Sequence, residues 1–204
     1  MNSINMLDNM DGITASTSLM IFSIFLLITN FEELADRNII LILIAAIGSL
    51  IGFLYHNWFP SKMYMGDAGS QFIGLFVAFF SIKFLWNLGS VTENSSWVSL
   101  IVTLTALTPA AADTLTVVIN RLLEGKSPMV GGKDHTTHHL VYAGFKDKEV
   151  WMIFSAIGFI SFVLSVSIIY LVIHEKIHFT LFFLLYFLVV FLLLYRNYQP
   201  QVIL

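Results

Sequence analysis

Tyr64-Met-Gly-Asp-Ala-Gly-Ser70 is the stretch at which a polar loop meets a long apolar run. Gly66 and Gly69 allow the backbone a tight or left-handed conformation and a close approach to a ligand. Between them, Asp67 is a carboxylate of the kind that binds a hard divalent cation such as Mg2+. The same arrangement is typical of a helix N-cap or turn, so the other polar segments must decide between the two interpretations.

The composition of the chain identifies it as an integral membrane protein. Of its 204 residues, 57% are hydrophobic and only 11% are charged, and the mean hydropathy is +0.83. A soluble domain carries about a quarter charged residues. Here the apolar excess falls into long runs that approach or exceed the length of a bilayer span. The sequence contains no cysteine, which excludes disulfides and thiolate metal sites.

Six apolar runs predict an all-α, polytopic bundle of about six transmembrane helices, forming a single membrane domain over residues 1–204. Their length and lack of polar alternation favour helices over barrel strands. The four tryptophans fall at or next to predicted ends, as in an interfacial aromatic belt. The runs are Ile13–Thr29, Ile39–Tyr55, Gln71–Leu88, Trp97–Ile119, Val150–Ile173 and Phe179–Tyr195.

The distribution of Lys and Arg predicts the orientation of these spans. With six spans, residues 1–12, 56–70, 120–149 and the C-terminal tail share one membrane face. Lys and Arg are concentrated on that face, and the opposite loops hold only Arg37 and Lys176. By the positive-inside rule the first face is cytoplasmic. We therefore expect a multi-pass protein of the cytoplasmic (inner) membrane whose candidate site residues face the cytoplasm.

Polar residues recur at every third position of the first segment: Asn2, Asn5, Asp8 and Asp11. On an α-helix or a 3-10 turn this spacing forms one polar stripe. Two carboxylates on such a stripe can hold a cation or bond to the donors of a sugar or base. A solvated N-terminal tail in which Asp11 caps the first long helix accounts for the same pattern.

Three histidines follow Lys133 and Asp134 in the third polar segment: His135, His138 and His139. The spacing does not match a zinc site, because cysteine and a second ligand pair are missing. Imidazoles beside a lysine and after two glycines suit phosphate binding or acid–base chemistry. The alternative is a flexible basic loop near anionic lipid.

A further carboxylate, Asp113, lies within the fourth apolar run. An ionisable residue inside a membrane span is energetically costly and is a candidate functional residue. Pro109 can kink the helix at this point and free a carbonyl group. A hydrogen bond from Asp113 to a neighbouring helix is the structural alternative.

Together these segments resemble the polyprenyl-phosphate N-acetylhexosamine-1-phosphate transferase superfamily (glycosyl transferase family 4). The stripe and Gly12 match the motif N-x-x-N-x-x-D-x-x-D-G, and Met65–Ser70 matches M-G-D-x-G-S. Asp113-Thr and the segment Gly132–His139 resemble the P-x-x-D-T and histidine-loop segments of the undecaprenyl-phosphate N-acetylglucosamine-1-phosphate transferase branch. Their order and their separation by helix pairs also agree.

Members of this family carry additional helices and an Asp-Asp motif upstream of the first motif. This chain lacks both, so it resembles the C-terminal half of the family fold. The alternative is therefore a truncated, non-catalytic membrane subunit or an inactive fragment. An ion transporter fits less well, because only Asp113 is plainly intramembrane.

The resemblance implies that N-acetylhexosamine 1-phosphate passes from a UDP-sugar to undecaprenyl phosphate, with release of UMP, in cell-wall or lipopolysaccharide synthesis. It implies Mg2+, or else Mn2+, on Asp67 and Asp8, with Asp113 in a supporting role. Expected partners are these substrates, membrane lipid and either a second copy or a separate N-terminal half, with no nucleic acid. The implied catalytic residues are Asp8, Asp11, Asp67, His135, His138 and His139. The implied substrate-binding residues are Asn2, Asn5, Lys133, Asp134 and Tyr64, the last stacking on uracil.

Overall fold

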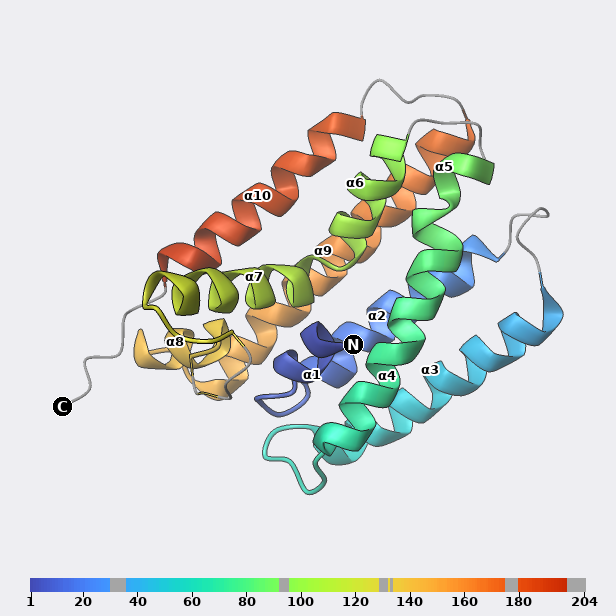
Figure 1. Ribbon diagram of the computed structural model, residues 1–204. Helices are drawn as coiled ribbons and strands as arrows, with labels where there is room; N and C mark the ends of the chain where they lie inside the picture. Colours follow the sequence, from blue (N-terminus) through green and yellow to red (C-terminus); the bar gives the residue numbers. More distant parts are fainter. Residues whose placement is uncertain (30–35, 92–95, 129–131, 133, 175–179, 198–204) are drawn as a thin grey trace.

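The computed structural model describes residues 1–29, 36–91, 96–128, 132, 134–174 and 180–197. All regular structure within these ranges is helical, which confirms the all-α prediction. The longer helices run alongside one another, whereas α7 lies across them (Figure 1). The helices are α1 (Asn2–Leu7), α2 (Ile13–Ile28), α3 (Arg37–Asn57), α4 (Gly66–Phe80), the π-helical segment η2 (Ser81–Trp86), α5 (Leu88–Val91), α6 (Ser96–Ala106), α7 (Thr108–Leu123), α8 (Thr136–Tyr142), α9 (Asp147–Ile173) and α10 (Thr180–Arg196).

The structure supports a multi-pass membrane protein, but it does not show six spans. Among the described residues, three helices are long and apolar enough to cross a bilayer: α3, α4 continued by η2, and α9. The pair α6 and α7 adds at most a fourth, broken span. Helix α2 has 16 residues, and the described apolar part of α10 is also shorter than the roughly 20 residues that a span requires.

The fourth apolar run is broken at Pro109, where the sequence predicts a kink. Helices α6 and α7 are bent by 88° relative to each other. Pro109 stands in the first turn of α7, where its missing N–H group costs no helical hydrogen bond, whereas a continuous helix from α6 through Pro109 would lose one. The hydroxyl of Thr108 donates to the carbonyls of Leu104 and Thr105, each at 2.9 Å, and so satisfies groups that the break exposes. The predicted kink is confirmed.

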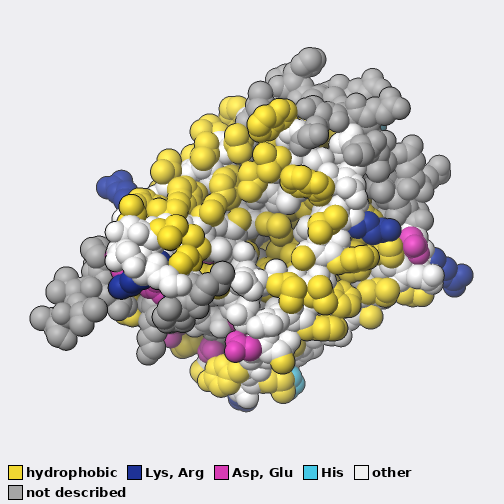
Figure 2. Space-filling view, in the orientation of Figure 1, with side chains coloured by type: hydrophobic (Ala, Val, Ile, Leu, Met, Phe, Trp, Pro, Cys, Tyr) yellow, Lys and Arg dark blue, Asp and Glu magenta, His cyan; other side chains and the backbone are white. Residues whose placement is uncertain are grey.

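Helix α2 lies at the centre of the bundle and packs against α3 and α9. Most of its residues are buried, including Phe22 and Phe25. Phe25 contacts the rings of Phe80 and Phe84, which connects α2 to α4 and η2. Hydrophobic side chains cover most of the outer face in Figure 2, and charged side chains lie at its edges and lower end. That distribution fits a lipid-facing surface.

The short helix α1 lies inside the bundle, between α4 and α7. Its side chains Ile4 and Leu7 are buried. Gly74 of α4 permits this approach, because a Cβ atom there would lie 2.8 Å from the carbonyl oxygen of Met1. The interpretation of the first motif as a solvated tail is therefore wrong.

Candidate functional site

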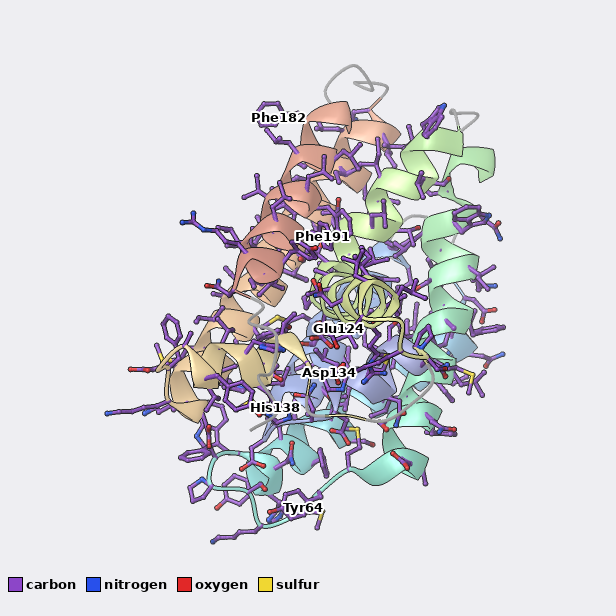
Figure 3. All side chains as sticks on the ribbon, turned by 60° about the vertical axis from the view of Figure 1, so that its left-hand side comes forward. Tyr64, Glu124, Asp134, His138, Phe182 and Phe191 are labelled. Atoms are coloured by element: carbon purple, nitrogen blue, oxygen red, sulfur yellow. The ribbon has the colours of Figure 1, made fainter. Side chains whose placement is uncertain are left out.

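Three polar segments from distant parts of the sequence meet at one end of the bundle. The turn after α1 contacts the loop between α3 and α4 through Asp11 and Ser61, and it contacts α8 through Asn9 and Thr137. Figure 3 shows Asp134 and His138 near one another beneath α7, with Tyr64 on the loop at the lower edge. The predicted convergence of the three motif segments is confirmed.

Asp67 is held by the first motif across 62 residues of sequence. The Nδ2 group of Asn5 donates to Asp67 Oδ1 at 3.1 Å and to Ser70 Oγ at 2.8 Å. Asp67 stands in the first turn of α4, where the helix dipole favours a negative charge. The residue at the N-cap position is Met65, so the interpretation of Asp67 as an N-cap is wrong. Gly66 has a φ of +68°, which confirms the expected left-handed backbone.

Asp8 lies close enough to Asp67 for the two carboxylates to repel. Burial raises the pKa of Asp8 from 3.8 to about 6, and the charge of Asp67 contributes to the rise. Two adjacent carboxylates and an amide oxygen are donors that suit Mg2+. Within the described residues, no three His, Cys, Asp or Glu side chains form a complete metal site. The assignment of Asp8 and Asp67 as metal ligands stays a prediction.

Asp11 binds the loop that precedes α4. Its carboxylate accepts hydrogen bonds from the backbone N–H of Ser61 at 2.9 Å and from the Ser61 hydroxyl at 2.8 Å. The N-cap of α2 is Gly12, so Asp11 does not cap that helix. Asn57 makes a second link, accepting from Gly12 N–H at 2.9 Å and donating to the Met63 carbonyl at 2.8 Å. Sequence reasoning missed Asn57 and Ser61, which carry no motif signal.

The three predicted histidines occupy different environments. His135 is largely buried and its Nδ1 shares a 3.2 Å hydrogen bond with Asp113 Oδ2. His139 is fully buried, and this burial lowers its pKa, so the ring is neutral at physiological pH. His138 is partly exposed and lines a cavity. Only His138 of the three is therefore placed to meet a ligand there.

Asp134 forms an ion pair with Arg121 within the protein. Its two carboxylate oxygens accept hydrogen bonds from Nε and Nη2 of Arg121, each at 2.6 Å. Burial alone would raise the pKa of Asp134, but the hydrogen bonds and charge of Arg121 outweigh it and hold the pKa below its usual value. Sequence analysis did not identify Arg121 as a site residue, because its partner lies 13 residues away across a loop. Lys133 lies outside the described residues, and Asn2 is exposed at the start of α1.

A polar cavity of about 260 Å3 lies where these segments meet. Residues of all three segments line it: Asn9, Met10 and Asp11 from the first, Phe59 from the second, and His138, Val141 and Asp147 from the third. Tyr64 is exposed and lines a separate apolar cavity of about 340 Å3 between α2, α3 and α4. That cavity faces away from Asp67, because Met65, Gly69 and Phe72 lie on the other side of α4.

Known proteins share the motif segments of this chain. The family described as "Glycosyl transferase family 4" matches residues 1–85. A probable undecaprenyl-phosphate N-acetylglucosaminyl 1-phosphate transferase of Bacillus subtilis is 30% identical over 160 residues, covering 78% of this chain and 42% of the relative. A decaprenyl-phosphate N-acetylglucosaminephosphotransferase of Mycolicibacterium smegmatis is 29% identical over 83% of this chain and 45% of its own length.

A third relative has a different named substrate. A phospho-N-acetylmuramoyl-pentapeptide-transferase of Listeria welshimeri is 28% identical over 82% of this chain and 48% of its own length. The chain spans about half the length of the curated relatives it matches. The shared motifs, their convergence in the fold and these similarities agree: the chain belongs to glycosyl transferase family 4, the superfamily of polyprenyl-phosphate sugar-1-phosphate transferases.

Proposed function

We propose that this chain forms the motif-bearing part of an enzyme that transfers N-acetylhexosamine 1-phosphate from a UDP-sugar to undecaprenyl phosphate. The reaction takes place at the cytoplasmic face of the inner membrane and begins a cell-envelope glycan. The observation that carries the proposal is the bond from Asn5 to Asp67, which brings two family motifs together at one end of a membrane bundle. The named relatives act on prenyl-phosphate or phospho-sugar substrates, which agrees with this reaction.

The chemistry is a phosphoryl transfer between two anions. An oxygen of the prenyl phosphate forms a bond to the sugar-linked phosphorus of the UDP-sugar. The bond from that phosphorus to the UMP oxygen breaks, and UMP leaves with the electron pair. Both reactants are negatively charged, so the reaction depends on positive charge and on fixed orientation. Mg2+ or Mn2+, held by Asp67 and Asp8, supplies that positive charge when bound.

The chain's own residues then orient the substrates. Asn5 fixes Asp67, and Ser61 fixes Asp11, so both carboxylates have defined positions. His138 lines the same polar cavity as Asp11, and its imidazole can donate a hydrogen bond there to a phosphoryl oxygen as charge develops. Lys133, in the same segment, is proposed to add positive charge there. Because the site lies at the end of membrane helices, the acceptor phosphate can reach it from the bilayer while its tail stays in lipid.

The proposal is tested by transfer of labelled sugar 1-phosphate from UDP-N-acetylglucosamine to undecaprenyl phosphate in detergent, with and without Mg2+. We expect metal-dependent lipid-linked product that disappears in Asp67→Asn. The matched control is Asp36→Asn, because Asp36 is an exposed N-cap of α3 and asparagine caps equally well.

Two further outcomes separate the alternatives. Activity that appears only after the N-terminal half of a relative is added would show that the chain needs a second part. Absence of product with both parts present, and with several UDP-sugars, would contradict the proposal and favour a non-catalytic membrane subunit.

A further inference from the structure

Helix α7 contributes a fully buried carboxylate to the segment that carries the histidines. Asp113 accepts hydrogen bonds from Thr136 N–H at 2.9 Å, from Thr136 Oγ1 at 2.5 Å and from His135 Nδ1 at 3.2 Å. All three donors belong to the start of α8. A buried carboxylate with these partners is well satisfied, and its removal would leave three buried donors without an acceptor. Asp113 therefore ties α7 to α8.

A second contact of α7 binds Asp134, the residue just before these donors. Arg121 lies eight residues after Asp113, about two helical turns along α7. Its guanidinium binds both oxygens of Asp134 and donates to the carbonyl of Pro128 at 2.8 Å. Helix α7 thus holds three consecutive residues, 134, 135 and 136. We call this set of contacts the α7 clamp: Asp113 and Arg121 with residues 134–136.

The other side of α8 is attached to the first motif. The hydroxyl of Thr137 donates to Asn9 Oδ1 at 2.6 Å, and Asn9 is fixed by its own bond to the Met6 carbonyl at 2.8 Å. His138 is the next residue, and it faces the polar cavity that Asn9 also lines. The position of His138 in the cavity therefore depends on the α7 clamp from one side and on Asn9 from the other.

We infer that Asp113 and Arg121 are positioning residues, which hold α8 so that His138 faces the polar cavity. Neither is among the residues that line this cavity, and the contacts described above let them act through α8. The 88° bend at Pro109 serves this role, because it turns α7 across the bundle, where Figure 3 shows Asp134 and His138 beneath it. The catalytic consequence of this inference rests on the proposed function, but the placement of His138 can be tested without it.

The placement is measured by crosslinking in a chain that has no cysteine of its own. Met10→Cys and His138→Cys put two thiols on the wall of one cavity, within reach of a short bifunctional thiol reagent. We expect crosslinking in the parent protein and a severalfold slower reaction after Asp113→Ala. Thr136→Val removes one donor and keeps the side-chain volume, so it should give a smaller loss in a protein that still folds. Ser165→Ala is the control, because Ser165 is equally buried but lies on α9.

Kinetics supply the second measurement in the active enzyme. Asp113→Ala should lower kcat about tenfold with little change in KM, because a shift of α8 would move His138 away from the position at which it acts. In a His138→Ala background the same change should have almost no further effect, because residues that act through one another are non-additive.

Each result has a defined meaning. Crosslinking that is unchanged by both Asp113→Ala and Thr136→Val overturns the inference, whatever the activity. An undiminished Asp113→Ala effect in the His138→Ala background overturns the action through His138. If the parent enzyme transfers no sugar phosphate, the proposed function fails, while the crosslinking rates still decide whether the α7 clamp places His138.

Discussion

The carboxylates on the two sides of the site have opposite electrostatic environments. Beside α1 and α4, burial raises the pKa of Asp8, and repulsion from the nearby charge of Asp67 adds to the rise. In the α7 clamp, Asp113 accepts a hydrogen bond from Thr136 of α8, and Asp134 accepts one from Arg121. We call the first region the acidic side, defined by Asp8 and Asp67. Both sides carry segments that resemble family motifs, but their electrostatics differ.

This difference leads us to expect ligand binding at the acidic side and a structural role for the clamp. A carboxylate pair without a cation is unfavourable, and a divalent metal relieves the repulsion when it binds. A carboxylate already satisfied by protein donors gains little from a ligand and loses much if a donor is removed. Mutations on the acidic side should therefore mainly lower activity. Mutations in the clamp should mainly lower stability and change the placement of His138.

The largest effect is expected from Asp67→Asn on the acidic side. The change keeps the shape of the side chain but removes the charge that is proposed to hold the metal. In a full-length family enzyme carrying this segment, we expect transfer to fall by about a thousandfold or more while membrane insertion is unchanged. Initial rates at saturating substrate measure the loss. Activity within a few fold of the parent would remove Asp67 from the metal site and end the contrast between the two sides.

In the clamp the largest expected effect is on stability. Arg121→Ala removes a guanidinium that is only 6% exposed and leaves Asp134 without its charge partner. We expect the free energy of unfolding in detergent to fall by about 3 kcal/mol. The control is Lys126→Ala, which breaks an exposed ion pair with Glu124 and should cost less than about 1 kcal/mol. Equal losses in both variants would show that the Arg121 pair is an ordinary surface contact.

Sequence reasoning predicted the acidic side better than the clamp, for a physical reason. Polar residues every third position and a carboxylate between glycines are local patterns, so Asn5, Asp8 and Asp67 could be named from spacing and motif. Because helix pairs separate the polar segments, the sequence also predicted that these segments lie on the same membrane face. The helical class and the kink at Pro109 were also predictable, because long apolar runs and a missing N–H group act locally.

The features of the site that the sequence did not predict depend on tertiary contacts, which leave no local pattern in the sequence. Arg121 reads as an ordinary end-of-helix cation, and Asp134 reads as part of a phosphate-binding loop, until the fold pairs them. Tyr64 lies only three residues before Asp67 in the sequence, yet it lines the apolar cavity on the other side of α4. The structure does not show all six predicted spans: among the described residues, α2 and α10 are short and α7 turns across the bundle, and apolar length alone does not reveal this turn.

The acidic side also depends on close backbone packing at Gly74. A methyl group there would lie 2.8 Å from the Met1 oxygen and 2.9 Å from the Met1 Cα, so α1 must move away from α4. We expect Gly74→Ala to lower transfer about tenfold or more, since overpacking of this kind costs about 1–3 kcal/mol and separates Asn5 from Asp67. Gly48→Ala and Gly52→Ala on α3 are matched controls, because neither added Cβ meets an atom within 4 Å. A loss in the controls would point to a general effect of alanine in these helices.

Metal affinity should depend on pH through Asp8. Its carboxyl must lose a proton before it can bind a cation, and its pKa is about 6. We therefore expect Mn2+ affinity to be constant above that value and to fall by about tenfold for each pH unit below it. Calorimetric titrations between pH 5 and pH 8 measure this slope. Asp8→Asn should bind more weakly and lose the slope near pH 6, and a slope that persists in this variant would assign the titration to another group.

The smallest effect, on stability without metal, has opposite signs on the two sides. The folded-state pKa of Asp8 lies above its ordinary value of 3.8, so the folded protein holds a proton that the unfolded chain has lost. Its contribution to stability therefore decreases as pH rises from about 4 to about 6. Asp134 has a lowered pKa, so its contribution is present above the ordinary value and is lost as pH falls further. Thermal unfolding of Asp8→Asn should lack the first loss and keep the second, while Arg121→Ala should show the reverse. If both variants flattened the same part of the profile, the two sides would share one titration and the electrostatic contrast between them would be false.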